Sequence, residues 1–346
     1  MTVSENTSVA NILYQFNEKY VPFAGTSILS LLIHNRDIDY LHFYVMDEDI
    51  SDDSKKRIEC LILQYGRKVT FLNSEKIIEQ LKALGIPSYR GSYSTNLKMF
   101  FPTVLAEHID RLIYIDSDTI INGSLRPLLT YDMAGKPIAM AYDSLGLRHA
   151  KLIGNRKTDG YFNAGVILFD VSQWKKLSCT EQIVRYAKDM RSHYISPDQD
   201  LLNIVLRGKI ALLPLAYNLQ PIHLICSPSE YRFLFRPKTY YAEQEIEIAV
   251  NSPVIYHFFR FLGEFPWHRD SMHPGKAVFE FYLKQSPWAD FHSSYTEQNS
   301  KVFRIERWMY QHMPSSLFFV CFRLCYDLFI YKCQLDSNKG KNNPSM

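Results

Sequence analysis

Short apolar segments alternate with amphipathic segments along most of this 346-residue chain. The apolar segments predict strands, and they cover residues 11–16, 41–45, 68–72, 111–115, 137–141, 162–170, 209–213 and 253–256. Apolar residues at helical spacing predict helices, which cover residues 23–34, 51–65, 74–84, 98–107 and 197–207, with a polar loop at 89–95. Ser51 and Ser74 stand where N-caps are expected. Strands that alternate with helices predict an α/β fold whose mainly parallel sheet is covered by helices on both faces.

The pattern becomes helical and aromatic after Pro266 and Trp267. Residues 301–313 place aromatic and aliphatic side chains among basic ones, and residues 317–331 are apolar over most of a helical circumference. We therefore expect an α/β domain over residues 1–270 and a helical, basic and aromatic extension over residues 271–346.

The small net charge of +3 arises at the C-terminus. Residues 301–346 carry seven Lys and Arg against three Asp and Glu. Nucleic-acid-binding proteins usually have a stronger and broader basic excess. The charge distribution therefore predicts a neutral body with a basic tail and no nucleic-acid partner.

The cysteines and the chain's apolar runs favour a cytoplasmic protein. None of the six cysteines forms a Cys-x-x-Cys pair, and the first ten residues lack the pattern of a secretory signal. The longest apolar run, Leu317–Phe322, is far shorter than the roughly 20 residues that span a bilayer. We expect a cytoplasmic location, with the basic tail able to hold the protein on the inner face of the membrane.

An acidic pair, Asp116-Ser117-Asp118, directly follows the predicted strand at 111–115. Two like charges at the end of a buried strand are costly without a cation, and a divalent ion could relieve the repulsion while holding a diphosphate. In α/β sheets, ligands bind at the carboxyl ends of the strands. The alternative is a solvated turn in which one Asp caps the next element.

Residues 111–120 (RLIYIDSDTI) resemble the metal-binding strand of glycosyltransferase family 8, which includes bacterial lipopolysaccharide galactosyl- and glucosyltransferases and glycogenin. Three further segments resemble that family's FNAGV strand, DQDxLN helix start and H…G…KPW loop; they are 161–170, 197–203 and 255–268. The resemblance covers about residues 10–268. It implies a GT-A, Rossmann-like catalytic domain with a mixed, mainly parallel sheet over residues 1–270. It also implies retaining transfer of a hexose, galactose or glucose, from a UDP-sugar to a glycan acceptor.

The resemblance assigns roles to particular residues. It implies Asp116, Asp118 and His257 as ligands of Mn²⁺ (or Mg²⁺), which suits two carboxylates and an imidazole. It implies Asp198 and Gln199 as catalytic residues and Asp143 as a residue on the acceptor side. The residues implied in nucleotide-sugar binding are Asn17, Lys98, Asp116, Ser117, Asp118, Asn163 and Gly165.

Structural explanations remain open for several of these residues. A buried, hydrogen-bonded histidine explains His257, and an ordinary core strand explains 162–170. Asp198 and Gln199 also suit a helix start, and Asn17 suits a strand-to-helix turn. Lys98 replaces the family's usual Arg, which keeps the charge and loses the bidentate fork, and a solvated Lys would look the same.

The last motif departs from the family. Phe265 stands where relatives place a Lys before Pro-Trp, and the loop is longer, with Gly263 shifted. Arg260 is the candidate to restore the missing charge. Arg260 and Gly263 therefore join the predicted nucleotide-sugar-binding residues.

We expect the metal, Lys98 and Arg260 to stabilise the charge that builds on the UDP leaving group. Because Gln199 is a poor nucleophile, same-face attack assisted by a donor phosphate oxygen is the simpler retaining mechanism. One alternative function is a haloacid dehalogenase-type phosphatase, although Ile120 stands where that site has Thr or Val. Another is a non-catalytic sugar-binding module.

The tail also has two interpretations. Residues 301–313 have the aromatic, basic pattern of a helix that lies on an anionic membrane surface. Nearly all-round apolarity over residues 317–331 equally suits a helix packed on the catalytic domain. Arg323 and Asp327 are spaced to pair on one helix face.

Overall fold

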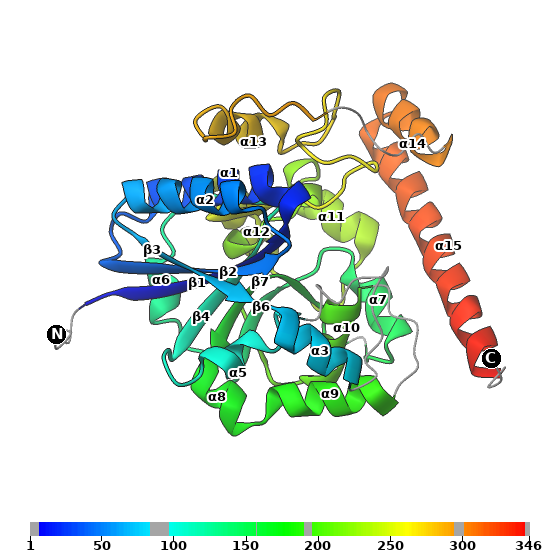
Figure 1. Cartoon of the computed structure of the whole chain (residues 1–346). Helices are drawn as coiled ribbons and strands as arrows, with labels where there is room; N and C mark the ends of the chain where they lie inside the picture. Colours follow the sequence, from blue (N-terminus) through cyan, green and yellow to red (C-terminus); the bar gives the residue numbers. More distant parts are fainter. Residues whose placement is uncertain (1–6, 84–96, 157, 190–195, 294–300, 343–346) are drawn as a thin grey trace.

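The computed structural model describes residues 7–83, 97–156, 158–189, 196–293 and 301–342. A seven-stranded sheet with the order β3-β2-β1-β4-β7-β6-β8 forms its centre (Figure 1). These strands are β1 (Val9–Asn17), β2 (Tyr40–Glu48), β3 (Lys68–Asn73), β4 (Arg111–Asp116), β6 (Ile138–Tyr142), β7 (Phe162–Asp170) and β8 (Ile210–Leu212). The sequence predicts all seven, and the loop expected at 89–95 lies outside the described residues.

The sheet is mixed and mainly parallel. β1 runs parallel to β2 and β4, β2 to β3, and β6 to β8, whereas β7 runs antiparallel to both β4 and β6. The segment 253–256, expected as another strand of this sheet, instead forms β9 (Ile255–His257) in a separate antiparallel pair with β5 (Thr119–Ile121). The sequence does not predict β5, because its three residues are too few to give a strand pattern of their own.

Helices cover both faces of the sheet and bury two hydrophobic clusters. The first cluster lies under α1 (Val21–His34), α2 (Asp52–Gln64), α6 (Arg126–Leu129), α11 (Pro228–Phe235), α12 (Glu243–Asn251) and α13 (Lys276–Leu283). The second lies under α3 (Glu75–Ala83), α5 (Phe101–Leu105), α8 (Val171–Lys176), α9 (Cys179–Asp189) and α10 (Pro197–Val205). Ser51 caps α2 as predicted, its hydroxyl accepting from the Ser54 amide at 3.3 Å. The helix expected over 98–107 is shorter because Pro102 fits only the first turn of α5.

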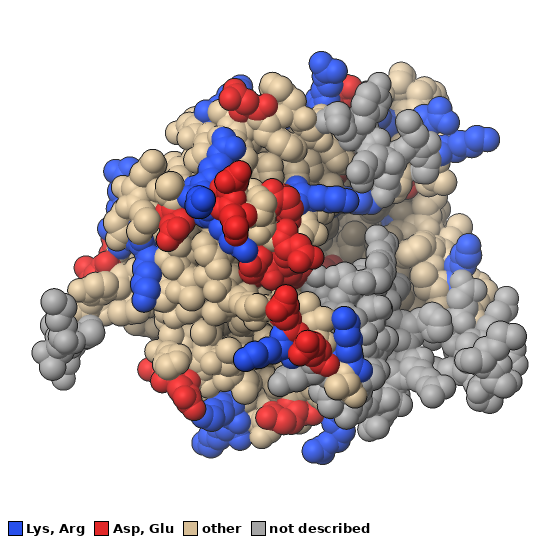
Figure 2. All heavy atoms as spheres, in the orientation of Figure 1, with Lys and Arg blue, Asp and Glu red and all other residues tan. Residues whose placement is uncertain are grey.

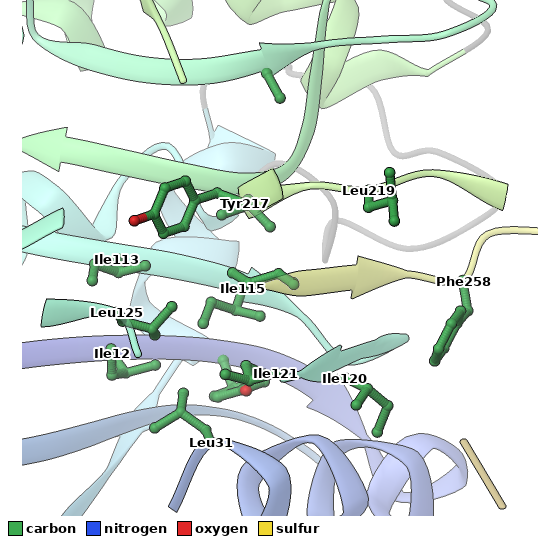
Figure 3. Close-up of a cluster of buried hydrophobic side chains, with 14 of the residues drawn as sticks. Ile12, Leu31, Ile113, Ile115, Ile120, Ile121, Leu125, Tyr217, Leu219 and Phe258 are labelled. Carbon is green, nitrogen blue, oxygen red and sulfur yellow. The ribbon is translucent and has the colours of Figure 1, made fainter. Parts of the chain in front are cut away.

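The first cluster fixes the strand ends that carry the acidic pair. Ile113 and Ile115 of β4 point into it beside Ile120 and Ile121 of β5, and all four are fully buried or nearly so (Figure 3). Burial of an aliphatic side chain of this size stabilises the fold by about 1.5–3 kcal/mol. The residues between β4 and β5 are therefore held on a rigid support.

The packing continues across the boundary expected at residue 270. α13 contacts α1, and Trp288 lies so close to Gly25 that a Cβ there would come within 2.0 Å of the indole. Residues as far as Trp288 thus belong to the same core as the sheet.

Two helices, α14 (Lys301–His312) and α15 (Ser315–Asn342), form the end of the chain, and α15 runs beside α11 and α7 (Gly146–Leu152) (Figure 1). Phe318, Phe319 and Ile330 of α15 are buried. Arg323, expected to pair with Asp327, donates to the Leu234 carbonyl at 2.9 Å. Among the described helices, none has the length and apolar character needed to cross a membrane.

Candidate active site

The acidic pair meets a histidine because β5 pairs with β9. Their register places Thr119 opposite His257, and the Phe258 amide donates to the Asp118 carbonyl at 2.7 Å. His257 Nε2 consequently lies 3.4 Å from Asp118 Oδ1 and 3.8 Å from Asp116 Oδ2. One ligand atom from each of these three side chains lies within 4.8 Å of the others. The three predicted metal ligands are thus brought together.

The three groups perturb one another's pKa values. Burial raises the pKa of Asp116 above its ordinary value, and the charge of Asp118 adds to that effect. Burial also acts to raise the pKa of Asp118, but His257 lowers it further, so that the net shift is downward. Burial acts to lower the pKa of His257, but Asp118 and Asp116 raise it above its ordinary value. Such a cluster gains from any positive charge placed between its members.

The histidine is oriented as a metal ligand would be. Asn218 uses its Nδ2 to donate to Asn163 Oδ1 at 2.9 Å, so its own Oδ1 faces His257 Nδ1 at 3.0 Å. Because that oxygen can only accept, Nδ1 carries a proton, which leaves Nε2, on the side of the carboxylates, as the nitrogen available to a metal ion. Two carboxylates and an imidazole nitrogen oriented in this way fit Mn²⁺ or Mg²⁺.

Gly165 makes room for that imidazole. A Cβ at this position would lie 2.1 Å from Cε1 and 2.5 Å from Nδ1 of His257. No larger residue could occupy position 165 without displacing the ring. The glycine of the predicted FNAGV strand therefore serves the histidine directly, in addition to lining the cavity described below.

Lys98 is buried beside Asp116, so the solvated alternative is wrong. Its Nζ lies 2.7 Å from Asp198 Oδ2 and 3.6 Å from Asp116 Oδ1, and it donates to the Ala164 carbonyl at 3.2 Å. Burial acts to lower the pKa of Lys98, but Asp116 and Asp198 together raise it. The lysine is therefore a fixed positive charge that links α10 to the end of β4.

The side-chain amides of Asn163 and Gln199 and the carboxylate of Asp143 form a hydrogen-bonded group next to Asp116, Asp118 and His257. Asn163 Nδ2 and Gln199 Nε2 both donate to Asp143 Oδ2, at 3.0 and 3.2 Å. Gln199 Oε1 accepts from the Ala164 amide at 2.9 Å. These contacts orient Asn163, Gln199 and Asp143 as one polar wall at the ends of β7 and β6.

Asn17 is the last residue of β1 and caps the short helix η1 (Glu18–Tyr20). Its Oδ1 accepts a hydrogen bond from the Lys19 amide at 3.1 Å. Glu18 in turn accepts from the Ser51 amide at 2.8 Å. The turn is therefore held by capping, as the structural explanation for Asn17 expects, and Asn17 still faces the cavity.

A cavity of about 750 Å³ joins these groups. Every predicted site residue lines it except Arg260 and Gly263. The Arg260 guanidinium lies 5.2 Å from the centre of the Phe265 ring. Gly263 has a φ of +76° and packs against Phe303 of α14, which a Cβ would approach to 2.6 Å. The loop thus reaches the cavity through Phe259, whereas Gly263 packs on α14 and Arg260 lies outside the cavity lining.

Sequence reasoning did not single out several residues in or beside the cavity, among them Tyr114, whose hydroxyl donates to Asp116, and Asn218, His149 and Tyr326. Tyr114 lies inside the recognised strand, two residues before Asp116, which is the only signal the sequence offers. The other three lie outside the four motifs.

On the face drawn in Figure 2, the described Lys and Arg side chains are interspersed with Asp and Glu and form no continuous basic surface. This distribution agrees with the charge count of the sequence and gives no support to a nucleic-acid-binding surface there.

The fold and the site define a class of protein: an α/β protein with an Asp-x-Asp pair and a histidine at the carboxyl edge of its sheet, facing a large polar cavity. The family model described as glycosyl transferase family 8 matches residues 11–271, and the chain belongs to that family. The resemblance drawn from the four motifs is confirmed. The chain is a glycosyltransferase, which removes the phosphatase alternative.

Relatives of known name match most of the chain. Lipopolysaccharide 1,2-glucosyltransferase of Escherichia coli (strain K12) is 27% identical over 291 residues, which are 82% of this chain and 81% of the relative. Lipopolysaccharide 1,3-galactosyltransferase of Salmonella typhimurium is 26% identical over 290 residues, which are 81% of this chain and 79% of the relative.

Solved structures support the GT-A fold. Galactosyltransferase LgtC, in complex with donor and acceptor sugar analogs, has a TM-score of 0.61 at 21% identity over 80% of this chain and 96% of its own. The WbbM bifunctional glycosyltransferase has a TM-score of 0.66 at 20% identity over 83% of this chain and 51% of its own.

Proposed function

We propose that this glycosyltransferase moves a hexose, galactose or glucose, from a UDP-sugar to a glycan acceptor in a reaction that needs Mn²⁺ or Mg²⁺. The observation that carries the proposal is that Asp116, Asp118 and His257 come together in the lining of one cavity. Relatives named as lipopolysaccharide glucosyl- and galactosyltransferases support a glycan that is lipid-linked or exposed on a surface as the acceptor.

The residues suit charge stabilisation on a diphosphate leaving group. Asp116, Asp118 and His257 would hold the divalent ion, which supplies positive charge to the diphosphate. Lys98 adds a second, buried positive charge 3.6 Å from Asp116. A fixed charge in a site shielded from water stabilises a developing negative charge more strongly than it would in solution.

The arrangement near the sugar favours attack from the face that the leaving group vacates. Asp198, a carboxylate of α10 that lines the cavity, forms an ion pair with Lys98 at 2.7 Å. Both the oxygen and the nitrogen of the Gln199 amide are hydrogen-bonded. Neither side chain is therefore free to act as a nucleophile. The bond from the anomeric carbon to the diphosphate oxygen breaks, and its electron pair leaves with UDP. The acceptor oxygen bonds to the same face of that carbon, and the acceptor's proton passes to a phosphate oxygen of UDP. This sequence retains the anomeric configuration without a carboxylate nucleophile.

The test is a panel of UDP-glucose, UDP-galactose, UDP-N-acetylglucosamine and GDP-mannose with Mn²⁺, monitored by nucleotide release. We expect slow UDP release from one UDP-hexose, because water can replace an absent acceptor. The Asp118→Asn variant should lose it, whereas Asp53→Asn, on an exposed face of α2, should not. Binding of a UDP-sugar without any release would support the non-catalytic sugar-binding module instead.

We also propose that α14 and α15 lie on an anionic membrane surface. Their outer side exposes large apolar side chains, among them Ile305, Trp308 and Leu328. Lys301 and Arg304 stand beside Ile305 and Trp308, and each basic side chain near an anionic leaflet adds about 1 kcal/mol of attraction. The two sequence interpretations of the tail are compatible, because the other side of α15 is packed on the catalytic core through Phe318 and Phe319.

Co-sedimentation with vesicles rich in phosphatidylserine or phosphatidylglycerol tests the membrane proposal. A variant with both Trp308→Ser and Leu328→Ser should lose most of its vesicle binding and keep its fold, since both side chains are exposed. The matched control is Phe281→Ser, an equally exposed aromatic on α13. Wild-type protein that stays in solution, or equal binding by both variants, would contradict the proposal.

A further inference from the structure

The end of the chain returns to the cavity of the active site. Tyr326 of α15 and His149 of α7 both line that cavity, although the family match ends at residue 271. α15 runs past α11 and α7 to reach this position (Figure 1). A segment outside the family's common core thus forms part of the wall around the reacting groups.

The two rings are joined by a hydrogen bond and are nearly parallel. Tyr326 Oη and His149 Nε2 are 2.6 Å apart, the ring centres are 6.1 Å apart, and the planes differ by only 12°. Tyr326 Oη and His149 Nε2 lie close to the planes of their rings. Rings stacked face to face would hold these two atoms more than about 3 Å apart, so the rings meet at their edges. Phe322, one helical turn before Tyr326, lies nearly parallel to it, with ring centres 6.3 Å apart. We name this His149–Tyr326 pair the aromatic platform.

The backbone that carries the platform is anchored. Ile330 of α15, four residues after Tyr326, is buried, and Arg323 is tied to the Leu234 carbonyl at 2.9 Å. α7 follows directly from the Asp143 segment, which the Ser144 amide fixes by donating to Gln220 Oε1 at 2.7 Å. The platform is therefore pre-formed, so ordering it on binding would cost little.

The order of the strands places the platform at the acceptor end of the cavity. Asn17 and Glu48 stand at the ends of β1 and β2, and Asp116 ends β4. Asp143 directly follows β6 and Asn163 is the second residue of β7, and α7 with His149 lies between these two strands in the chain. A UDP-sugar laid from the β1–β2 end across the metal cluster would point its sugar at Asn163 and Asp143. Beyond that sugar lies the aromatic platform.

We propose that the aromatic platform binds the acceptor through the apolar face of a hexopyranosyl ring, and that Tyr326 sets acceptor specificity. Aromatic faces suit the C–H face of a pyranose, while the ring's hydroxyl groups stay free to point at the polar wall of Asp143 and Gln199. The assignment rests on the proposed function, since it takes the donor to be a UDP-hexose.

The experiment separates donor reactions from acceptor reactions. UDP release from the active UDP-hexose is measured with water alone and with a panel of methyl α- and β-hexopyranosides, for wild type, Tyr326→Ala and Tyr326→Phe. Tyr326→Ala should raise the KM for the stimulating glycoside about tenfold or more, the scale of one lost aromatic contact. UDP binding and release into water should stay unchanged. Tyr326→Phe keeps the ring and should restore most of the acceptor affinity.

The matched control is Tyr331→Ala, the same change at an exposed position of the same helix, which should leave the acceptor KM as in wild type. An unchanged acceptor KM in Tyr326→Ala overturns the proposal. So does an equal loss in UDP binding and release into water, which would make Tyr326 structural. Wild-type release into water that no hexopyranoside stimulates overturns the assigned acceptor class, whereas absence of any release refutes the donor chemistry instead.

Discussion

A single methyl group placed at position 165 should disable the metal site and leave the rest of the protein in place. Gly165 is the residue in β7 against which His257 packs. In Gly165→Ala the new Cβ would lie 2.1 Å from Cε1 of the imidazole. Carbon atoms at their optimal separation are about 3.5–4.0 Å apart, so the ring must move by more than about 1 Å.

A displacement of this size should weaken metal binding, because metal ligands must be positioned precisely. Ligand side chains must be held within about 0.5 Å of their productive positions. Displacing the ring also strains its bond to Asn218, which is 3.0 Å long. Removing a residue that hydrogen-bonds to a metal ligand typically weakens metal binding about 10–100-fold. Displacing the ligand itself should weaken it at least as much. Overpacking should lower the free energy of unfolding by about 1–3 kcal/mol.

Titration of Mn²⁺ in the presence of UDP, followed by calorimetry, measures the effect, and urea denaturation measures the fold. Gly123→Ala is the matched control, because its Cβ would meet Val254 at an ordinary 3.4 Å. We expect the control to bind Mn²⁺ as the wild type does. Unchanged Mn²⁺ affinity in Gly165→Ala would refute the assignment of His257 as a ligand held in place by this glycine.

Three further variants probe the surroundings of the metal cluster. Asn218→Leu removes the acceptor for His257 Nδ1 and should weaken Mn²⁺ binding about 10–100-fold in the same titration; an unchanged affinity would make Asn218 a bystander. Lys98→Met leaves the partly buried carboxylates of Asp116 and Asp198 without their partner and should lower the free energy of unfolding in urea by about 1.5–3 kcal/mol, part of which Mn²⁺ should restore; equal stability would mean that the carboxylates are already protonated. Arg260→Ala should change the UDP dissociation constant by no more than about twofold, as for a residue outside the site. A loss of tenfold or more would show that the loop closes onto the diphosphate.

Much of the sheet could be predicted from the sequence because its signals are local. β4 is an apolar run with a polar residue at each end, and β7 is a mainly apolar run that ends on Asp170. The acidic pair at the end of β4 was recognisable for the same reason. The short β5 was not, because its three residues acquire a strand conformation only by pairing with β9, more than a hundred residues away.

The parts of the site that the sequence could not supply depend on long-range contacts. Asn218 lies 39 residues before His257. It stands in an irregular segment, where no hydrophobic periodicity indicates which way its side chain faces. Tyr326 is one of many aromatics in the tail, and only the path of α15 beside α7 brings it to the cavity. Arg260 is the reverse case, because the sequence suggested it for the site and the structure places it outside the cavity lining. Its charge could replace the missing lysine, but its guanidinium contacts Phe265, and Gly263 in the same loop packs on α14.

The dependence of catalysis on a divalent ion bound by Asp116, Asp118 and His257 is the central claim. It is tested most directly by UDP release from the active UDP-hexose, measured in Mn²⁺, then in excess EDTA, then after Mn²⁺ is restored. The predicted result is release that disappears in EDTA and returns with Mn²⁺ in wild type, and that stays absent throughout in Asp118→Asn. Full release in EDTA, or full activity of the Asp118→Asn enzyme, would contradict the claim.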